Sequence, residues 1–142
     1  MEIIDGEGLI LGRLASEVAK ALLKERRKGI IIVNAEHVLI SGSKEAIFKE
    51  YKRKKDRGSP EQGPYYPKMP DRILKRAIRG MLPYKRERGQ DALSRLRIYS
   101  GIPDEYAGRA RKSIEYADAA RLSIAKYVTL GAVSKKLGWA QK

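Results

Sequence analysis

Four basic side chains in the middle of the chain recur at the spacing of one helix face. Arg72, Lys75, Arg76 and Arg79 fall within an arc of about 100° on a helical wheel, and no carboxylate lies between them. The opposite face of this segment spans about 140° and comprises Ile73, Leu74, Ala77, Ile78 and Met81. Arginine pairs bidentately with phosphate and stacks on exposed bases. The stripe therefore predicts a helix that packs on one side and follows a nucleic-acid backbone on the other. An ordinary solvated helix face is the alternative.

Further bases and two aromatic residues flank this stripe. The end of the preceding helical segment, residues 52–55, is basic all round, which predicts that it does not pack against the protein. Tyr65 and Tyr66 lie in a proline-rich loop, where they either stack on unpaired bases or anchor the loop. Besides the stripe, the expected RNA-binding residues are Lys52, Arg53, Lys54, Lys55, Arg57, Lys68, Lys85, Arg86, Arg88, Tyr65 and Tyr66.

Residues for catalysis or for a metal site are scarce. The chain has one histidine, His37, no cysteine and no dense cluster of Asp and Glu, so neither a catalytic triad nor a metal site is indicated. We expect no enzyme activity and no cofactor. Zinc-finger spacing and basic-zipper heptads are also missing, which argues against a sequence-specific DNA reader.

A glycine-rich segment near the N-terminus offers an alternative of another class. The spacing Gly6-x-Gly8-x-x-x-Gly12 differs from the G-x-G-x-x-G of dinucleotide-binding turns. Glu36, after the second expected strand, is a conceivable partner for a ribose hydroxyl. A nucleotide-using α/β enzyme is therefore the rival hypothesis, although turn glycines before a helix explain the spacing more simply.

The charge of the chain is strongly positive and unevenly spread. The net charge is +14, yet residues 1–48 hold seven bases and seven acids, so the whole excess lies in residues 49–142. A thermostable charged surface would be balanced, whereas an excess of this size indicates a polyanionic partner, either nucleic acid or an anionic membrane. The longest apolar run, Ile30–Val33, is too short to span a bilayer. We expect a soluble cytoplasmic protein.

The elements that must position these residues follow from local periodicity. Strands are expected at residues 2–5, 30–35, 38–40 and 96–99, and helices at 12–27, 44–57, 71–82 and 91–95. A terminal helix is expected from a cap at Thr129 to Leu137. Residues 58–70 hold four of the six prolines and must form a loop. The strand, helix, strand order of the first 35 residues predicts a βαβ unit and hence a parallel sheet.

Several blocks of the sequence resemble one known family. Three of them are Leu11–Ser16, Ile30–Glu36 and Ser41-Gly42; the fourth is Arg76–Pro83 ("RAIRGMLP"), followed by Arg95–Gly101. In this order they are similar to the large-ribosomal-subunit proteins numbered thirteen, over residues 2 to 103. The "RGMLP" block after an amphipathic helix is the most specific of them.

This resemblance implies a fold, a function and partners. The fold would be a three-layer α/β/α domain on a four-stranded parallel sheet of order 3-2-1-4. The protein would be a structural constituent of the large ribosomal subunit that binds its ribosomal RNA and supports early assembly. Neighbouring large-subunit proteins, such as the one numbered three, would be partners. A free-standing RNA chaperone, which would bind isolated RNA tightly, is a second alternative.

The chain departs from the bacterial pattern of that family at two places. Arg27-Lys28-Gly29 leads directly into Ile30 without the usual insertion, and a longer tail follows Pro103. Both features favour an archaeal type. We expect one domain over residues 1–142, with an α/β core at 1–101 and an irregular or helical C-terminal extension at 102–142. Whether the extension meets RNA or protein stays open.

Overall fold

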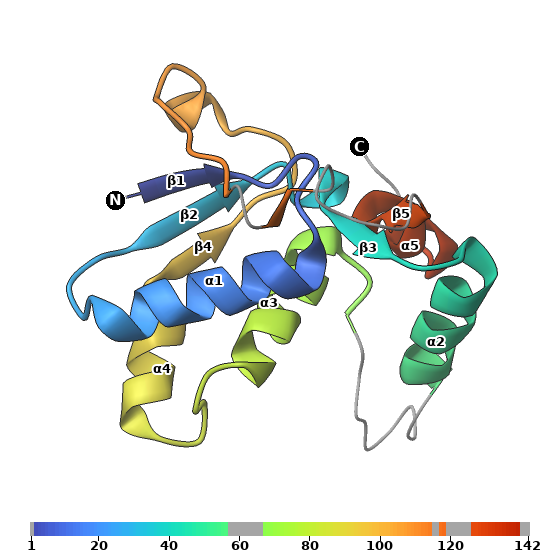
Figure 1. Ribbon diagram of the computed structural model, residues 1–142, viewed down its shortest axis with the longest axis horizontal. Coiled ribbons are helices and arrows are strands. Elements are labelled where there is room, and N and C mark those ends of the chain that lie inside the picture. Colours follow the sequence, from blue (N-terminus) through green and yellow to red (C-terminus); the bar gives the residue numbers. More distant parts are fainter. Residues whose placement is uncertain (1, 57–66, 115–116, 119–125, 140–142) are drawn as a thin grey trace.

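A parallel sheet of three strands forms the centre of the protein (Figure 1). The computed structural model describes residues 2–56, 67–114, 117–118 and 126–139. The strands are β1 (Glu2–Asp5), β2 (Ile30–Val33) and β4 (Leu96–Ile98), in the order β1-β2-β4. β1 pairs in register with β2, from Glu2 opposite Ile30 to Asp5 opposite Val33, and β2 pairs with β4 from Ile30 opposite Leu96.

The central strand β2 is buried on both faces, as its unbroken β-branched run predicts. Ile30 and Ile32 point into the main core, whereas Ile31 and Val33 point into a smaller cluster on the other face. This alternation follows from the two-residue period of a strand. The predicted α/β fold with a parallel sheet is therefore confirmed.

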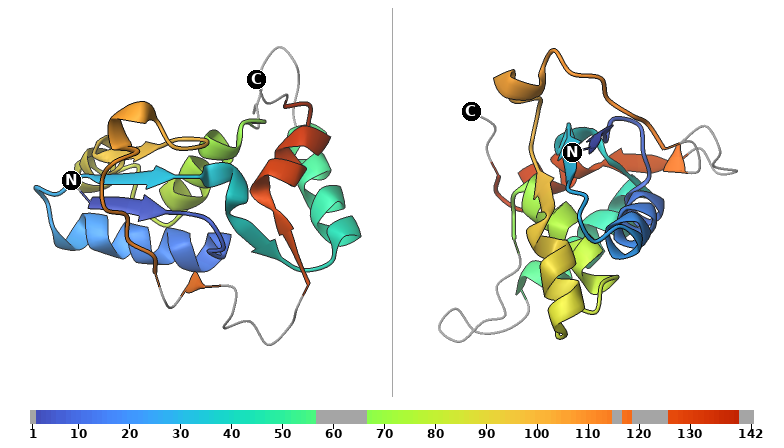
Figure 2. Two further views of the ribbon diagram at one scale, coloured as in Figure 1. Left: turned by 90° about the horizontal axis from the view of Figure 1, so that it is seen from above. Right: turned by 90° about the vertical axis from the view of Figure 1, so that its left-hand side faces the viewer.

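Three helices cover the main-core face of this sheet. They are α1 (Leu11–Lys24), α3 (Pro70–Gly80) and α4 (Glu87–Ser94), and α1 packs against both others. Tyr99, Ile102 and Tyr106 cover the other face, from a segment with a single short 3-10 helix, η2 (Asp104–Tyr106). Figure 2 shows this segment crossing the sheet from above. The three-layer α/β/α arrangement was expected to have an α-helix on this face. Among the described residues, this irregular segment covers the face instead.

The expected four-stranded sheet of order 3-2-1-4 is wrong. β3 (Leu39–Ser41) leaves the parallel sheet and pairs antiparallel with β5 (Tyr127–Thr129). The chain turns away after β2 because Asn34 adopts a left-handed conformation with φ 57°, and a 3-10 helix, η1 (Ala35–His37), follows. β5 was not expected from the sequence, because it forms by pairing with β3, which lies more than eighty residues earlier in the chain.

Two helices flank this small antiparallel sheet. They are α2 (Lys44–Asp56) and α5 (Leu130–Lys136), which contact each other and β5. The expected cap at Thr129 is confirmed, since its Oγ1 accepts a hydrogen bond of 3.2 Å from the amide of Ala132. The C-terminal extension is thus built into the fold through β5, and also through Lys112, whose amide donates to the carbonyl of Ile3 at 2.8 Å.

Several expected element boundaries shift. α1 ends at Lys24 instead of Arg27, α3 ends at Gly80 instead of Leu82, and α4 begins at Glu87 instead of Asp91. Met81 lies beyond α3 and is 46% exposed, so its expected place on the buried face is wrong. Within the described ranges, no helix combines the length and the apolar character needed to cross a membrane.

Candidate nucleic-acid interface

Helix α3 carries the predicted stripe. Its first turn contains Pro70, whose missing amide hydrogen would have no acceptor within the helix in any case. The negative charge of Asp71 in the same turn interacts favourably with the positive end of the helix dipole. Ile73, Leu74 and Ile78 are at most 1% exposed and anchor one side of the helix in the core. The two-faced character predicted for this helix is therefore confirmed.

The bases of α3 are not all equally available. Arg72, Lys75 and Arg79 are exposed, whereas Arg76 is half-buried and has an interaction of its own. Asp71 lies four residues before Lys75 without forming an ion pair with it, and its Oδ1 is buried. Three exposed cations without carboxylate partners among the described residues thus line the outer face of α3.

The basic end of α2 is partly engaged within the protein. Lys55 Nζ donates a 2.9 Å hydrogen bond to the carbonyl of Leu137, which ends α5. Lys54 lies 3.7 Å from Glu50 and 4.8 Å from the ring centre of Tyr51. The prediction that this turn does not pack is therefore wrong for Lys54 and Lys55, because long lysine stems let the ammonium groups reach back to the fold. Lys52 and Arg53 remain exposed.

The segment after α3 carries three expected basic residues and one aromatic ring that was not expected from the sequence. Lys85, Arg86 and Arg88 are exposed, as expected. The guanidinium of Arg79 lies 4.7 Å from the ring centre of Tyr84, which is 38% exposed. An exposed aromatic ring next to basic side chains can stack on a nucleobase. The place of Tyr84 between Pro83 and Lys85, in a basic loop, was the sequence feature that could have indicated this role.

Three of the expected residues, Arg57, Tyr65 and Tyr66, lie outside the described residues. Lys68 is exposed and runs beside Gly138, which has φ +109°. The remaining expected bases do not form one compact patch. Figures 1 and 2 show α2 and α4 at opposite ends of the molecule, with α3 between them.

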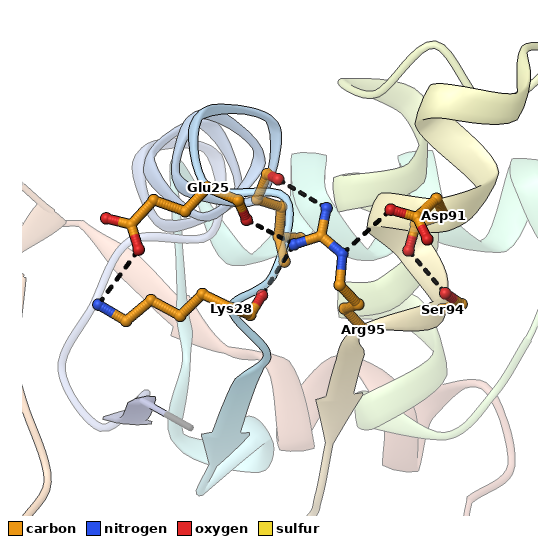
Figure 3. A network of polar contacts seen from close by, with 6 residues as sticks. Glu25, Lys28, Asp91, Ser94 and Arg95 are labelled. Carbon is orange, nitrogen blue, oxygen red and sulfur yellow. Dashed lines mark hydrogen bonds and ion pairs between the residues drawn. The ribbon is translucent and has the colours of Figure 1, made fainter.

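A network of hydrogen bonds around Arg95 joins the elements at the end of the sheet where β2 and β4 begin (Figure 3). Its guanidinium donates to the carbonyl of Leu22 at 2.8 Å, of Glu25 at 2.7 Å and of Lys28 at 2.8 Å. Its Nε lies 3.3 Å from Asp91 Oδ2. Arg95 thereby satisfies carbonyls at the C-terminus of α1 that have no helical partner. It also joins α1, the turn before β2 and α4.

The features proposed for the rival nucleotide site do not converge. Gly6 packs closely, since a Cβ there would lie 2.8 Å from Val38 and 3.1 Å from the carbonyl of Val33. Glu36, the conceivable ribose partner, is 6% exposed, and both carboxylate oxygens are buried. His37 is exposed and lies 3.6 Å from Glu36 Oε1. In the part of the chain that the structure describes, no three His, Cys, Asp or Glu residues form a metal-binding group.

The chain is similar to known proteins over nearly its whole length. Residues 1–105 match the family described as "Ribosomal protein L13". The "Large ribosomal subunit protein uL13" of Methanosarcina barkeri is 57% identical over 138 residues, which cover 97% of this chain and 98% of the relative. The protein of the same name from Methanococcoides burtonii is 56% identical with the same coverage. That of Archaeoglobus fulgidus is 51% identical over 96% of this chain and 87% of its own length.

Proposed function

Because this chain belongs to the ribosomal protein L13 family, we propose that it is a structural constituent of the large ribosomal subunit that binds large-subunit ribosomal RNA and supports early assembly. The family expected from the sequence blocks is confirmed, and the similar proteins carry the names of ribosomal proteins rather than of enzymes. In this proposal the protein works in the cytoplasm, on the ribosome.

The outer face of α3 is the single observation that supports RNA binding most directly. Arg72, Lys75 and Arg79 stand on a rigid helix whose other side is locked in the core. The helix holds these cations at a fixed spacing on one face, and each neutralised phosphate adds a salt-dependent increment to affinity. We include Lys52, Arg53, Lys85, Arg86 and Arg88 in the proposed surface because they are exposed.

We also propose a domain organisation and protein partners. We regard residues 1–142 as one domain, since the extension supplies β5 to the small sheet and Tyr106 to the cover of the main one. Neighbouring large-subunit proteins, the one numbered three among them, would complete the binding site. Exposed Met69 and Met81, at the two ends of α3, are candidates for such protein contacts.

A charge-reversal experiment tests the proposal. The triple variant Arg72→Glu, Lys75→Glu, Arg79→Glu should no longer co-sediment with large subunits after a high-salt wash, because three phosphate contacts become repulsive. Lys20→Glu, Lys24→Glu, Lys44→Glu is the matched control, with the same charge change at exposed positions on α1 and α2. If the α3 variant still co-sediments as wild type does, α3 is not the anchor.

A further inference from the structure

Two adjoining hollows run along the outer edge of β4, away from the predicted bases of α2. One, of about 620 Å³, lies between the turn at residues 25–29 and the start of β4. The other, of about 430 Å³, lies between β4 and α3. Both are lined by Ser94 and Arg97, so the two hollows adjoin along the strand. We call them together the β4 groove.

The groove gathers cations from three parts of the chain. Arg26 and Arg27 come from the turn before β2, Arg97 from β4, and Arg72 and Lys75 from α3. All five are exposed, and none has an ion pair among residues 2–56, 67–114, 117–118 and 126–139. The first two lie in the half of the chain whose net charge is zero, so the charge distribution along the sequence did not indicate them.

The acidic residues of the groove do not neutralise these cations. Glu25 lies 3.6 Å from Lys28, which is also 3.7 Å from Glu2. Asp71 has one buried oxygen and belongs to the first turn of α3. Arg95 also lines the groove, but its guanidinium is committed to three carbonyls. The unpaired charge of the groove is therefore positive.

The walls of the groove are fixed before any ligand arrives. The bonds from Arg95 to Glu25 and Lys28 hold the turn that bears Arg26 and Arg27 against the start of β4, as Figure 3 shows. β4 pairs only with β2 among the described residues, so its outward amides have no strand partner. Cations spaced along a strand edge with unpaired backbone amides suit an extended chain of phosphates.

We propose that the β4 groove binds the phosphate backbone of one ribosomal RNA segment, continuing the surface of α3 around the edge of the sheet. This inference rests on the proposed RNA-binding function and adds Arg26, Arg27 and Arg97 to it. An added strand from another protein would also fit an open edge. The charge favours RNA, because half of the lining residues are Lys or Arg, whereas the apolar side chains Leu96, Ile98 and Tyr99 line only the hollow beside α3.

The test compares two triple variants of the full chain. Arg26→Gln, Arg27→Gln, Arg97→Gln removes three charges from the groove, and Lys20→Gln, Lys24→Gln, Lys44→Gln removes three elsewhere. Binding to in vitro transcribed large-subunit ribosomal RNA is measured over a series of KCl concentrations. The slope of log affinity against log salt should fall by about 2 to 3 for the groove variant and remain near the wild-type value for the control.

The outcomes separate the two proposals. If wild type binds this RNA and the groove variant keeps the slope of the control, the groove proposal is overturned while RNA binding stands. If wild type binds neither this RNA nor large subunits, both fail; if it binds large subunits only, the same two variants are compared by co-sedimentation. Circular dichroism monitors folding, and the double variant Arg26→Gln, Arg27→Gln decides the matter should the triple variant unfold, because both residues lie in an exposed turn. If groove substitutions weaken only the association with another ribosomal protein, a strand partner replaces RNA.

Discussion

Arg95 is a basic residue that stabilises the fold and is not left free to bind a ligand. Its side chain is 16% exposed and spans three carbonyls and one carboxylate. A guanidinium can reach all four acceptors, because its five N–H donors point outward in one plane. An ammonium group has three donors on a single nitrogen and cannot. Basic residues in this chain therefore divide into those that hold the fold, such as Arg95 and Lys55, and those left free on the surface.

We predict that Arg95→Lys lowers the free energy of unfolding by about 2 kcal/mol, because at least one charge-assisted hydrogen bond is lost and a carbonyl is left without a donor. Urea denaturation measures the change. Arg88→Lys, at an exposed position on α4, should leave the midpoint almost unchanged. Equal stability of the Arg95 variant and wild type would contradict the role given to the network.

Tyr106 is a second residue whose surroundings change its chemistry. A hydrogen bond with Glu105, helped by burial and by the charges of Glu105 and Tyr99, raises the pKa of Tyr106 from 10.0 to about 12. The folded state thus holds this proton more tightly than the unfolded state does. The stabilisation is fully present below about pH 10 and is lost as the pH rises towards 12.

This pKa is measured from the absorbance of tyrosinate during an alkaline titration, as the difference between wild type and Tyr106→Phe. We expect a midpoint near 12. Glu105→Gln should bring the midpoint closer to 10.0, since the carboxylate is the main cause of the shift. A midpoint at 10.0 in wild type would show that the hydrogen bond does not form in solution.

At the scale of elements, short helices depend on their ends. α5 has only seven residues, too few to be stable in isolation, and Thr129 both closes β5 and caps this helix. Val133 and Ser134 are fully buried, so α5 is also held by its packing on the core. α3 illustrates the converse, since its capping residue Met69 makes no side-chain hydrogen bond and burial of three aliphatic residues holds the helix instead.

Thr129→Ala should reduce the free energy of unfolding by about 1 kcal/mol, because one amide at the start of α5 loses its acceptor. Thr129→Ser keeps the hydroxyl and should retain most of the stability. Thermal denaturation of the three proteins provides the measurement. Alanine and serine variants of equal stability would indicate that the hydroxyl contributes nothing and that any loss comes from the missing methyl group.

At the scale of the whole molecule, the C-terminal extension closes the fold. It crosses the second face of the main sheet, where Ile102 and Tyr106 pack against Ile3 and Ile31. It then supplies β5 as the partner of β3 (Figure 1). Without it, one face of the sheet and one edge of β3 would be open to water.

A chain that ends at Pro103 should therefore lose cooperative unfolding and bind a hydrophobic dye, because apolar surface of β1 and β2 becomes exposed. Addition of a separate peptide with residues 104–142 should restore part of the transition, since the removed contacts are non-covalent. Cooperative unfolding of the truncated chain would mean that residues 1–103 form a domain by themselves.

Much of the architecture is determined by the sequence itself. The period of Ile73, Leu74 and Ile78 predicts α3 and its free face, the run from Ile30 to Val33 predicts a doubly buried strand, and Thr129 predicts a cap. These are local properties, because helix and strand geometry place neighbouring side chains at known angles. The family blocks likewise needed no structure to be recognised.

The pairing of distant segments depends on the tertiary fold. β3 leaves the parallel sheet for β5, which lies more than eighty residues further along, and Lys55 reaches the end of α5. Arg26 and Arg27 come to lie beside Arg97 although their own half of the chain is neutral. The physical reason is that such contacts depend on the energy of packing the whole chain, which no local pattern records. That packing divides the bases into those committed to the fold and those left free for a phosphate backbone.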